Sequence, residues 1–355
     1  MSESVAPDLR RLPAVSKNDS QMKNRIVQVV GTIVVVAVGV GSGCSGESDP
    51  GDDGARPTVV ASFAPLAWAA ERIGGDAIDV VDLTPPGVEP HDLELSPSQI
   101  ATVGDARLAI VVGGGFQPAV EDAAAGLGDD ALVLLDRIDL GDGADDDHAD
   151  DSADDHPGDD ADDDADDHAD AADDGHGHGD VDPHIWLDPV LMVEVVEVMG
   201  DEIAQRLPAD AERIQTNVEA LVSELVALDR DARDVLATCG RRELITAHDA
   251  FGRFAARYDL TAIPIAGISP DIEPSPDRLA ELTDLAREHG VTTIFAEVLV
   301  SPEIAETLAR EAGGLEVARL DPIEGFTDEQ RDAGVTYLDV MRDNVDAVSA
   351  GLDCA

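Results

Sequence analysis

Short apolar runs alternate with amphipathic helical patterns in the first half of the chain. Four apolar runs predict strands, at residues 58–62, 78–83, 108–112 and 131–135. Helical patterns lie between them, for example at residues 65–73 and 97–103. Near-continuous apolar strands that alternate with helices are typical of a parallel sheet with both faces covered. This pattern predicts an N-terminal lobe over residues 57–141, completed by residues 183–208.

The same alternation returns in the C-terminal third. Predicted strands lie at residues 243–247, 261–265, 292–296 and 316–320. Predicted helices lie at residues 250–258, 275–289, 302–312 and 337–352. Ser275 and Pro276 fit the cap and the first position of one of these helices. A second parallel-sheet lobe is therefore predicted over residues 239–355.

A long helical pattern lies between the two predicted lobes. Residues 209–237 place apolar side chains on one helical face, namely Ile214, Val218, Leu221, Leu225 and Leu228. A helix of this length runs for about 40 Å. The predicted fold class is therefore α/β, with two parallel-sheet lobes bridged by one long rigid helix over residues 209–238.

The N-terminus has the pattern of an export signal. An apolar run at residues 26–40 follows Lys23 and Arg25 and precedes Gly41 and Cys44. A basic start, an apolar stretch and small residues before a cysteine predict cleavage before Cys44 and lipidation of its thiol, although Gly41 stands where an aliphatic residue is usual. The alternative, a transmembrane anchor, needs about 20 apolar residues. We expect a signal over residues 1–44, a flexible tether over 45–56, and attachment to the extracytoplasmic face of the membrane.

The charge of the chain excludes one class of partner. It has 76 acidic and 23 basic residues and a net charge of -53, so it does not bind nucleic acid through the phosphate backbone. Residues 142–182 contain 20 Asp and five His but no Lys, Arg or Glu, and this low-complexity loop cannot bury a core. Within it, His176 and His178 lie close enough in sequence to share a weakly bound metal ion.

Three other histidines lie beside predicted strands in two lobes. They are His91, His184 and His248. Ligands of open α/β sheets bind at the carboxyl ends of strands, and Asp321 follows a predicted strand in the same way. Three imidazoles and one carboxylate would complete a tetrahedral Zn²⁺ site.

Four further residues have two interpretations each. Glu89 is an accessory ligand or a solvated loop carboxylate, and Glu297 orients a ligand histidine or takes part in ordinary packing. Cys239 and Cys354 form one disulfide in an oxidising compartment or remain two unpaired thiols.

Six segments together resemble a known family. They are GVEPHDLELSP, DPHIWLDP, TAHDAFGRFAARY, GISPDIEPSP, IFAEVLVSP and LDPI. In this order they resemble the zinc/manganese solute-binding lipoproteins of ABC transporters, the ZnuA-like and TroA-like group, from about residue 58 to the C-terminus. The resemblance implies a metal site in the cleft between the lobes, with His91, His184, His248 and Asp321 as ligands. The Asp/His-rich loop takes the place of the His-rich loop of the zinc-specific branch.

The resemblance also implies a function. Such a protein binds a metal ion outside the cytoplasm and delivers it to an ABC permease and its ATPase. We expect Zn²⁺, because manganese-type members carry a carboxylate at the position of His248. We also expect a monomer. We expect no enzymatic activity, since four protein ligands leave no open position for water. The alternatives are a manganese-binding member, a zinc hydrolase with an open three-histidine site, and an adhesin-like or metal-buffering surface protein.

Overall fold

A computed structural model describes residues 56–140, 181–270, 274–299 and 301–355. The predictions for the export signal, Cys44, the tether before residue 56, His176 and His178 lie outside the described residues, as does all but the end of the Asp/His-rich loop. Within the described ranges, no helix combines the length and the apolar character that a membrane crossing needs.

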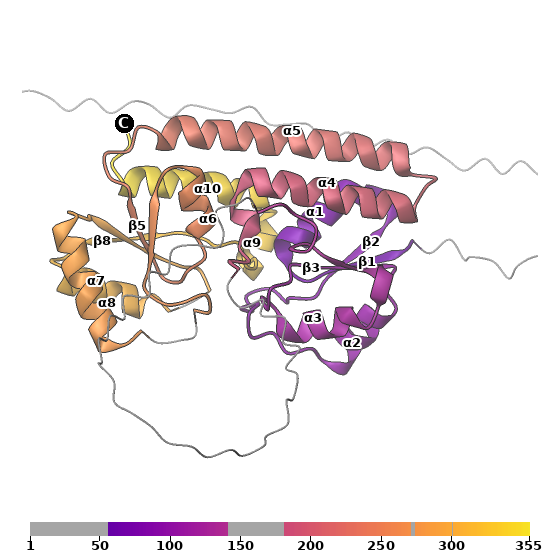
Figure 1. Ribbon diagram of the computed structural model, residues 1–355, viewed down its shortest axis with the longest axis horizontal. Helices are drawn as coiled ribbons and strands as arrows, with labels where there is room; N and C mark the ends of the chain where they lie inside the picture. Colours follow the sequence, from indigo (N-terminus) through magenta and orange to yellow (C-terminus); the bar gives the residue numbers. More distant parts are fainter. Residues whose placement is uncertain (1–55, 141–180, 271–273, 300) are drawn as a thin grey trace, which may run out of the picture. The chain divides into compact units, whose positions relative to one another are not determined.

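Two four-stranded sheets, both entirely parallel, form the centres of the two lobes (Figure 1). The N-terminal sheet has the order β2-β1-β3-β4, with β1 at Thr58–Ala61, β2 at Asp79–Asp82, β3 at Leu108–Val111 and β4 at Ala131–Val133. The C-terminal sheet has the order β6-β5-β7-β8, with β5 at Glu243–Thr246, β6 at Thr261–Pro264, β7 at Thr293–Ala296 and β8 at Glu316–Arg319. The α/β prediction with two parallel-sheet lobes is confirmed.

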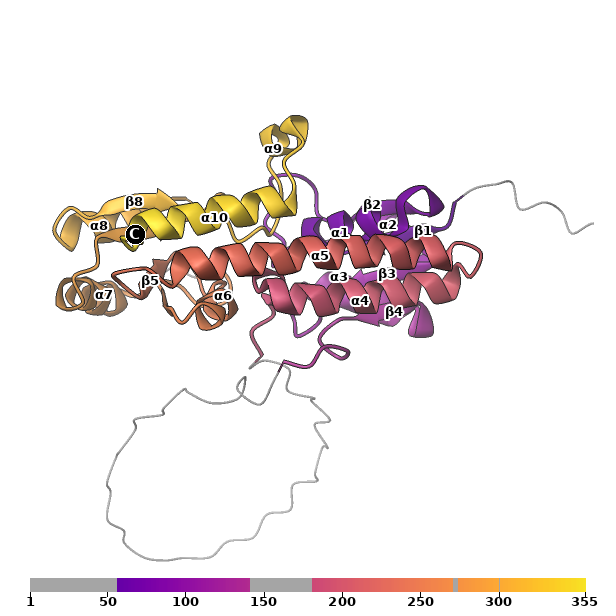
Figure 2. The same ribbon diagram turned by 90° about the horizontal axis from the view of Figure 1, so that it is seen from above.

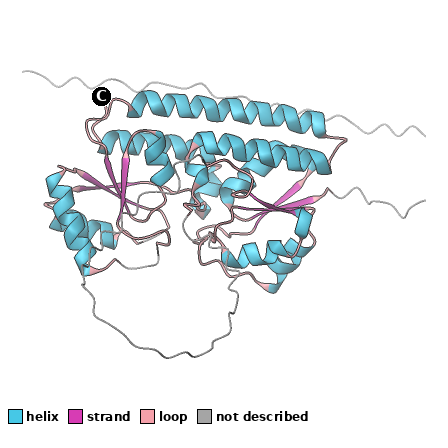
Figure 3. Ribbon diagram, viewed as in Figure 1, coloured by secondary structure: helices cyan, strands magenta, loops and turns pink. Residues whose placement is uncertain are grey.

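Helices connect the strands and cover the sheets (Figure 3). They are α1 at Ala64–Gly74, α2 at Pro97–Gly104, α3 at Pro118–Ala125, α4 at Pro189–Arg206, α5 at Ala211–Leu236, α6 at Gly252–Arg257, α7 at Pro276–Glu288, α8 at Glu303–Glu311, α9 at Asp328–Ala333 and α10 at Tyr337–Gly351. Helices α3 and α9 are absent from the sequence-based prediction, because α3 buries only Val120 and Ala124 and α9 buries no side chain, so neither has a clear apolar face in the sequence.

Helix α5 runs along both lobes and shares one core with them (Figure 2). Its buried face packs on α1 and α4 of the N-terminal lobe and on α10 of the C-terminal lobe. One continuous cluster of buried side chains includes Phe63 of the N-terminal lobe, Leu225 of α5, and Phe254 and Tyr337 of the C-terminal lobe. Opening the lobes widely would expose this apolar surface, at about 25 cal/mol for each Å².

Smaller apolar clusters cover the opposite faces of the two sheets, with α2 and α3 on one and α7 and α8 on the other. The end of the chain is tied back to the end of α5. Cys239 and Cys354 form a disulfide. The structure therefore agrees with the first of the two interpretations of these cysteines.

Candidate metal centre

Four side chains of metal-ligating type converge between the lobes. One potential ligand atom each of His91, His184, His248 and Glu324 lies within 4.8 Å of the others. His91 lies on the loop after β2, and His184 immediately precedes the short 3-10 helix Ile185–Leu187 that leads into α4. His248 follows β5, and Glu324 lies between β8 and α9. Each lobe therefore supplies two of the four groups.

The spacing of these atoms suits a tetrahedral divalent ion. Oε1 of Glu324 lies 3.0 Å from Nε2 of His248, 3.3 Å from Nε2 of His184 and 3.6 Å from Nε2 of His91. Ligands about 2.0–2.1 Å from a central ion are about 3.3 Å apart in a tetrahedron. Nε2 of His91 and Nε2 of His184 are buried and have no hydrogen-bond partner, which is costly unless another group binds there. The four side chains therefore fit a closed metal site.

Asp182 fixes the orientation of His184. Its Oδ1 accepts hydrogen bonds from Nδ1 of His184 at 2.7 Å and from the backbone N–H of the same residue at 2.9 Å. The imidazole is completely buried. Because Nδ1 is held by a carboxylate, Nε2 is left facing the cluster, which is the usual arrangement around metal-binding histidines.

Glu297 holds His248 in the same way. Its Oε2 lies 2.6 Å from Nδ1 of His248, and its Oε1 accepts the backbone N–H of that residue at 3.0 Å. Glu297 follows β7 and His248 follows β5, and these neighbouring strands meet where the strand order reverses. The carboxyl ends of strands at such a point are the usual ligand site of an open parallel sheet. This contact supports the interpretation of Glu297 as an orienting partner.

His91 is supported differently. Its ring meets Phe116 edge-on with the centroids 4.7 Å apart, and its backbone N–H donates to Oε2 of Glu89 at 3.0 Å. In the part of the chain that the structure describes, no carboxylate hydrogen-bonds to its Nδ1. Oε1 of Glu89 is buried without a partner and lies 4.0 Å from Nε2 of His91, so Glu89 borders the cluster without joining it.

The charges of the cluster are strongly coupled. Burial alone would raise the pKa of Glu324, but the imidazoles of His248, His184 and His91 outweigh it and hold the pKa well below its usual range. Burial acts in the opposite direction on His248, where Glu324 and Glu297 prevail and raise the pKa to about 10. Burial also acts to lower the pKa of His184, but Asp182 and Glu324 outweigh it and raise this pKa. Without a metal ion, a proton on His248 therefore offsets part of the charge of the buried carboxylates at neutral pH.

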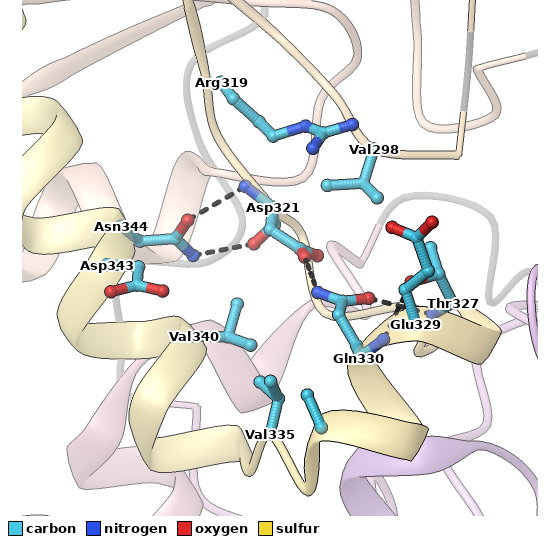
Figure 4. A pocket seen from close by; sticks show the side chains of 11 residues that line it. Val298, Arg319, Asp321, Thr327, Glu329, Gln330, Val335, Val340, Asp343 and Asn344 are labelled. Carbon is cyan, nitrogen blue, oxygen red and sulfur yellow. Dashed lines mark hydrogen bonds between the residues drawn. The ribbon is translucent and has the colours of Figure 1, made fainter.

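Asp321, the fourth ligand of the sequence-based prediction, is not part of the group. Its Oδ1 accepts the backbone N–H of Ile323 at 2.8 Å, and its Oδ2 accepts Nε2 of Gln330 at 3.0 Å. This carboxylate lines a separate pocket of about 580 Å³, together with Asn344. Figure 4 shows both side chains at that pocket. On this point the structure differs from the prediction, because Asp321 closes the turn after β8 and Glu324, three residues later, reaches the histidines.

The loop from Asp321 to Glu324 is anchored to both lobes. Asn344 of α10 exchanges two hydrogen bonds with the backbone of Asp321, at 2.9 and 2.6 Å. From the N-terminal lobe, Nε1 of Trp186 donates to the backbone O of Pro322 at 2.7 Å. These contacts fix the position from which Glu324 reaches the cluster.

Sequence reasoning missed Glu324 and Asp182. Glu324 lies in the same loop after β8 as Asp321. A position just after a strand does not distinguish between two carboxylates in one loop. Asp182 stands two residues before His184, a spacing at which an Asp side chain often bonds the following backbone. That spacing was the available signal for it.

Three comparisons describe what the chain is similar to. The model of a family described as ZnuA, zinc-uptake complex component A, periplasmic, matches residues 59–351. The high-affinity zinc uptake system protein ZnuA of Bacillus subtilis is 35% identical over 327 residues, which cover 91% of this chain and 96% of that protein. The zinc-binding protein AdcA of Streptococcus pyogenes is 32% identical over 84% of this chain, which spans only 56% of AdcA.

A solved structure has the same architecture. The crystal structure of the Zn(II)-bound ZnuA-like domain of AdcA from Streptococcus pneumoniae matches with a TM-score of 0.66 and 27% identity, over 84% of this chain and 99% of that domain. Sequence and structure comparisons therefore lead to the same group of proteins.

Proposed function

The chain belongs to the ZnuA family of zinc-uptake components, and from this premise we propose that it captures Zn²⁺ outside the cytoplasm and delivers the ion to the permease of a metal ABC importer. One observation carries the proposal. Three buried Nε2 atoms lie 3.0–3.6 Å from Oε1 of Glu324, and the ligand atoms of the four residues, two from each lobe, lie within 4.8 Å of one another, which suits a tetrahedral zinc site.

The ligand set favours zinc over manganese. His91, His184 and His248 offer neutral nitrogen, which suits Zn²⁺, whereas Mn²⁺ prefers sites rich in carboxylate, carbonyl and water oxygen. Glu324 supplies the single negative charge. Asp182 and Glu297 hold two of the rings in place, so little ordering remains to be done when the ion binds.

The arrangement suits capture and release rather than catalysis. Four protein ligands fill a tetrahedral zinc site, whereas a catalytic zinc keeps a position open for water. Because each lobe contributes two ligands, a small displacement of one lobe against the other would halve the ligand set. We infer that docking on the permease releases the ion in this way.

The remaining parts of the proposal concern the location of the protein. We propose that the chain is exported and lipidated at Cys44. We also propose that it acts as a monomer at the outer face of the membrane. Labelling of the expressing cells with a palmitate analogue tests the anchor. A matched Cys44→Ser variant should lose the label and leave the membrane fraction.

Metal analysis of the full chain tests the function. Protein purified without added metal should carry one zinc ion per chain, and a chelator competition should show tighter binding of Zn²⁺ than of Mn²⁺. A chain that retained no zinc, or that preferred manganese in the competition, would overturn the proposal.

A further inference from the structure

Arg253 touches the segment that carries His184, although it lies outside the four-ligand group. Its Nε and Nη2 both donate to the backbone O of Asp182, at 2.9 and 2.6 Å, and its Nε lies 3.6 Å from Oδ2 of the same residue. The side chain is 11% exposed. The guanidinium is therefore a fixed fork and not a solvated surface charge.

Arg253 holds Asp182, and Asp182 in turn orients the candidate ligand His184. Oδ1 of Asp182 accepts both Nδ1 and the backbone N–H of His184. Arg253, Asp182 and His184 thus form a continuous chain of contacts that ends at Nε2 of the imidazole.

The backbone beside Arg253 is also shaped to this contact. A Cβ on Gly252 would lie 3.2 Å from Oδ2 of Asp182, closer than an ordinary contact. The start of α6 thus approaches the carboxylate closely because residue 252 has no side chain. Asp182 is enclosed by His184 on one side and by the start of α6 on the other.

This chain of contacts crosses between the lobes. Arg253 belongs to α6 of the C-terminal lobe, whereas Asp182 and His184 belong to the segment that leads into α4 of the N-terminal lobe. A ligand of one lobe is consequently oriented by a side chain of the other.

Arg257 shows what a purely structural arginine looks like on the same helix. It lies one turn further along α6 and bonds both carboxylate oxygens of Asp229 on α5, at 2.8 and 2.9 Å. Its Nε also lies 3.8 Å from Oδ1 of Asp188. Among the described residues, it forms no hydrogen bond or ion pair with a candidate ligand or with Asp182. Arg257 is therefore a control for the charge and helix position of Arg253, with a side chain that is 26% exposed against 11%.

We propose that Arg253 is a positioning residue of the metal site, which holds Asp182 and thereby Nε2 of His184 in place across the two lobes. This inference rests on the proposed function, since it assigns a role within the same site. Loss of an outer partner of a metal-binding histidine typically weakens binding by about 10–100-fold, and we expect a loss of about tenfold because Arg253 acts through Asp182.

The test compares four forms of the full chain: wild type, Arg253→Ala, Arg253→Lys and Arg257→Ala. A chelator competition gives the dissociation constant for Zn²⁺, and the visible absorption of bound Co²⁺ reports the ligand geometry. Arg253→Ala should weaken zinc binding by about tenfold and shift the Co²⁺ bands. Arg253→Lys, which can still donate to the backbone O of Asp182, should recover part of both. Arg257→Ala should lower the unfolding temperature while both metal readouts stay at wild type.

The outcomes separate this inference from the proposed function. If wild type binds zinc tightly and Arg253→Ala matches it in affinity and Co²⁺ spectrum, the positioning role is wrong and the function stands. An equal loss in Arg257→Ala would also overturn it, since the effect would then be one of general stability. If wild type itself binds no zinc tightly, both proposals fall. Should Arg253→Ala not fold, an affinity and a spectrum of Arg253→Lys equal to wild type would overturn the inference.

Discussion

The two lobes have the same strand order but hold their metal-ligating histidines differently. In the C-terminal lobe, His248 and its partner Glu297 follow adjacent central strands, so the sheet itself sets their spacing. In the N-terminal lobe, His91 follows the edge strand β2 and His184 precedes α4, so neither is placed by the centre of the sheet. A shared topology therefore does not mean that ligands are equally well fixed.

Side-chain contacts partly compensate for this difference. His184 has Asp182 as its partner, and Asp182 is in turn held from the C-terminal lobe by Arg253. His91 has an aromatic neighbour, Phe116. The comparison thus ranks the three histidines by how firmly they are held: His248 first, His184 second and His91 third.

The largest expected effect is the loss of a firmly held ligand. His248→Ala and His184→Ala should each weaken zinc binding by more than about a hundredfold, since loss of a ligand exceeds the 10–100-fold loss typical of its outer partners. His91→Ala should weaken it less than either. Chelator competition on the three variants measures the ranking, and an affinity of His184→Ala equal to wild type would remove this residue from the site.

The fourth ligand can be decided by two isosteric substitutions. Glu324→Gln removes the charged ligand oxygen and should weaken zinc binding by about a hundredfold. Asp321→Asn alters only a turn that bonds Ile323 and Gln330, so it should leave the affinity near wild type and lower the free energy of unfolding by about 1 kcal/mol. The reverse pattern would restore Asp321 as the ligand.

The carboxylates behind the histidines should have a graded effect. Asp182→Asn and Glu297→Gln should each weaken zinc binding by about 10–100-fold, because both residues bond Nδ1 of a candidate ligand. Glu89→Gln is the matched control, since within the described residues Glu89 bonds backbone N–H groups and no ring nitrogen. Calorimetry would contradict the comparison if Glu89→Gln had the larger effect.

Zinc affinity should rise with pH. The buried carboxylates raise the pKa of His248 to about 10, so that in the metal-free protein the ring carries a proton at neutral pH. A histidine ligand must be neutral, so zinc displaces this proton and the apparent affinity increases about tenfold per pH unit for each proton released. Calorimetry between pH 6 and 8 in buffers of different ionisation enthalpy counts these protons. Binding without proton release would refute the charge balance.

The smallest expected effect is a change in metal preference. His248→Glu replaces a nitrogen ligand with a harder oxygen ligand and should move the ratio of zinc to manganese affinity towards manganese by about tenfold. The new carboxylate would face Glu297 and Glu324. The added negative charge would attract any cation and would not favour zinc in particular. A mixed-metal titration with an unchanged ratio would count against the role given to this position.

Much of the fold could be predicted from the sequence. Each of the eight strands that the structure describes lies within its predicted range. The signal is strongest for β3 and β7, whose four residues are all buried, as expected of central strands in a covered parallel sheet. The caps of α2 and α7 at Ser96 and Ser275 are also visible in the sequence. The helices α3 and α9 were missed, since α3 buries only two side chains and α9 buries none, which leaves no apolar face to detect.

The site could be predicted only as far as each residue follows from local sequence. Three histidines beside strands indicated a metal group, but the fourth member depended on the path of one loop. Ile323 adopts a positive φ of 56°, and the turn that results directs Glu324 and not Asp321 to the histidines. Asp182 and Arg253 meet through a contact between lobes that no sequence pattern records.

The most direct measurement is a crystal structure of the full chain soaked with zinc, with diffraction data collected on both sides of the zinc absorption edge. The anomalous difference map should contain one strong peak between the lobes, about 2.0–2.1 Å from Nε2 of His91, His184 and His248 and from a carboxylate oxygen of Glu324. A main peak at another place, or a zinc ion bound by Asp321 in place of Glu324, would contradict the proposed site.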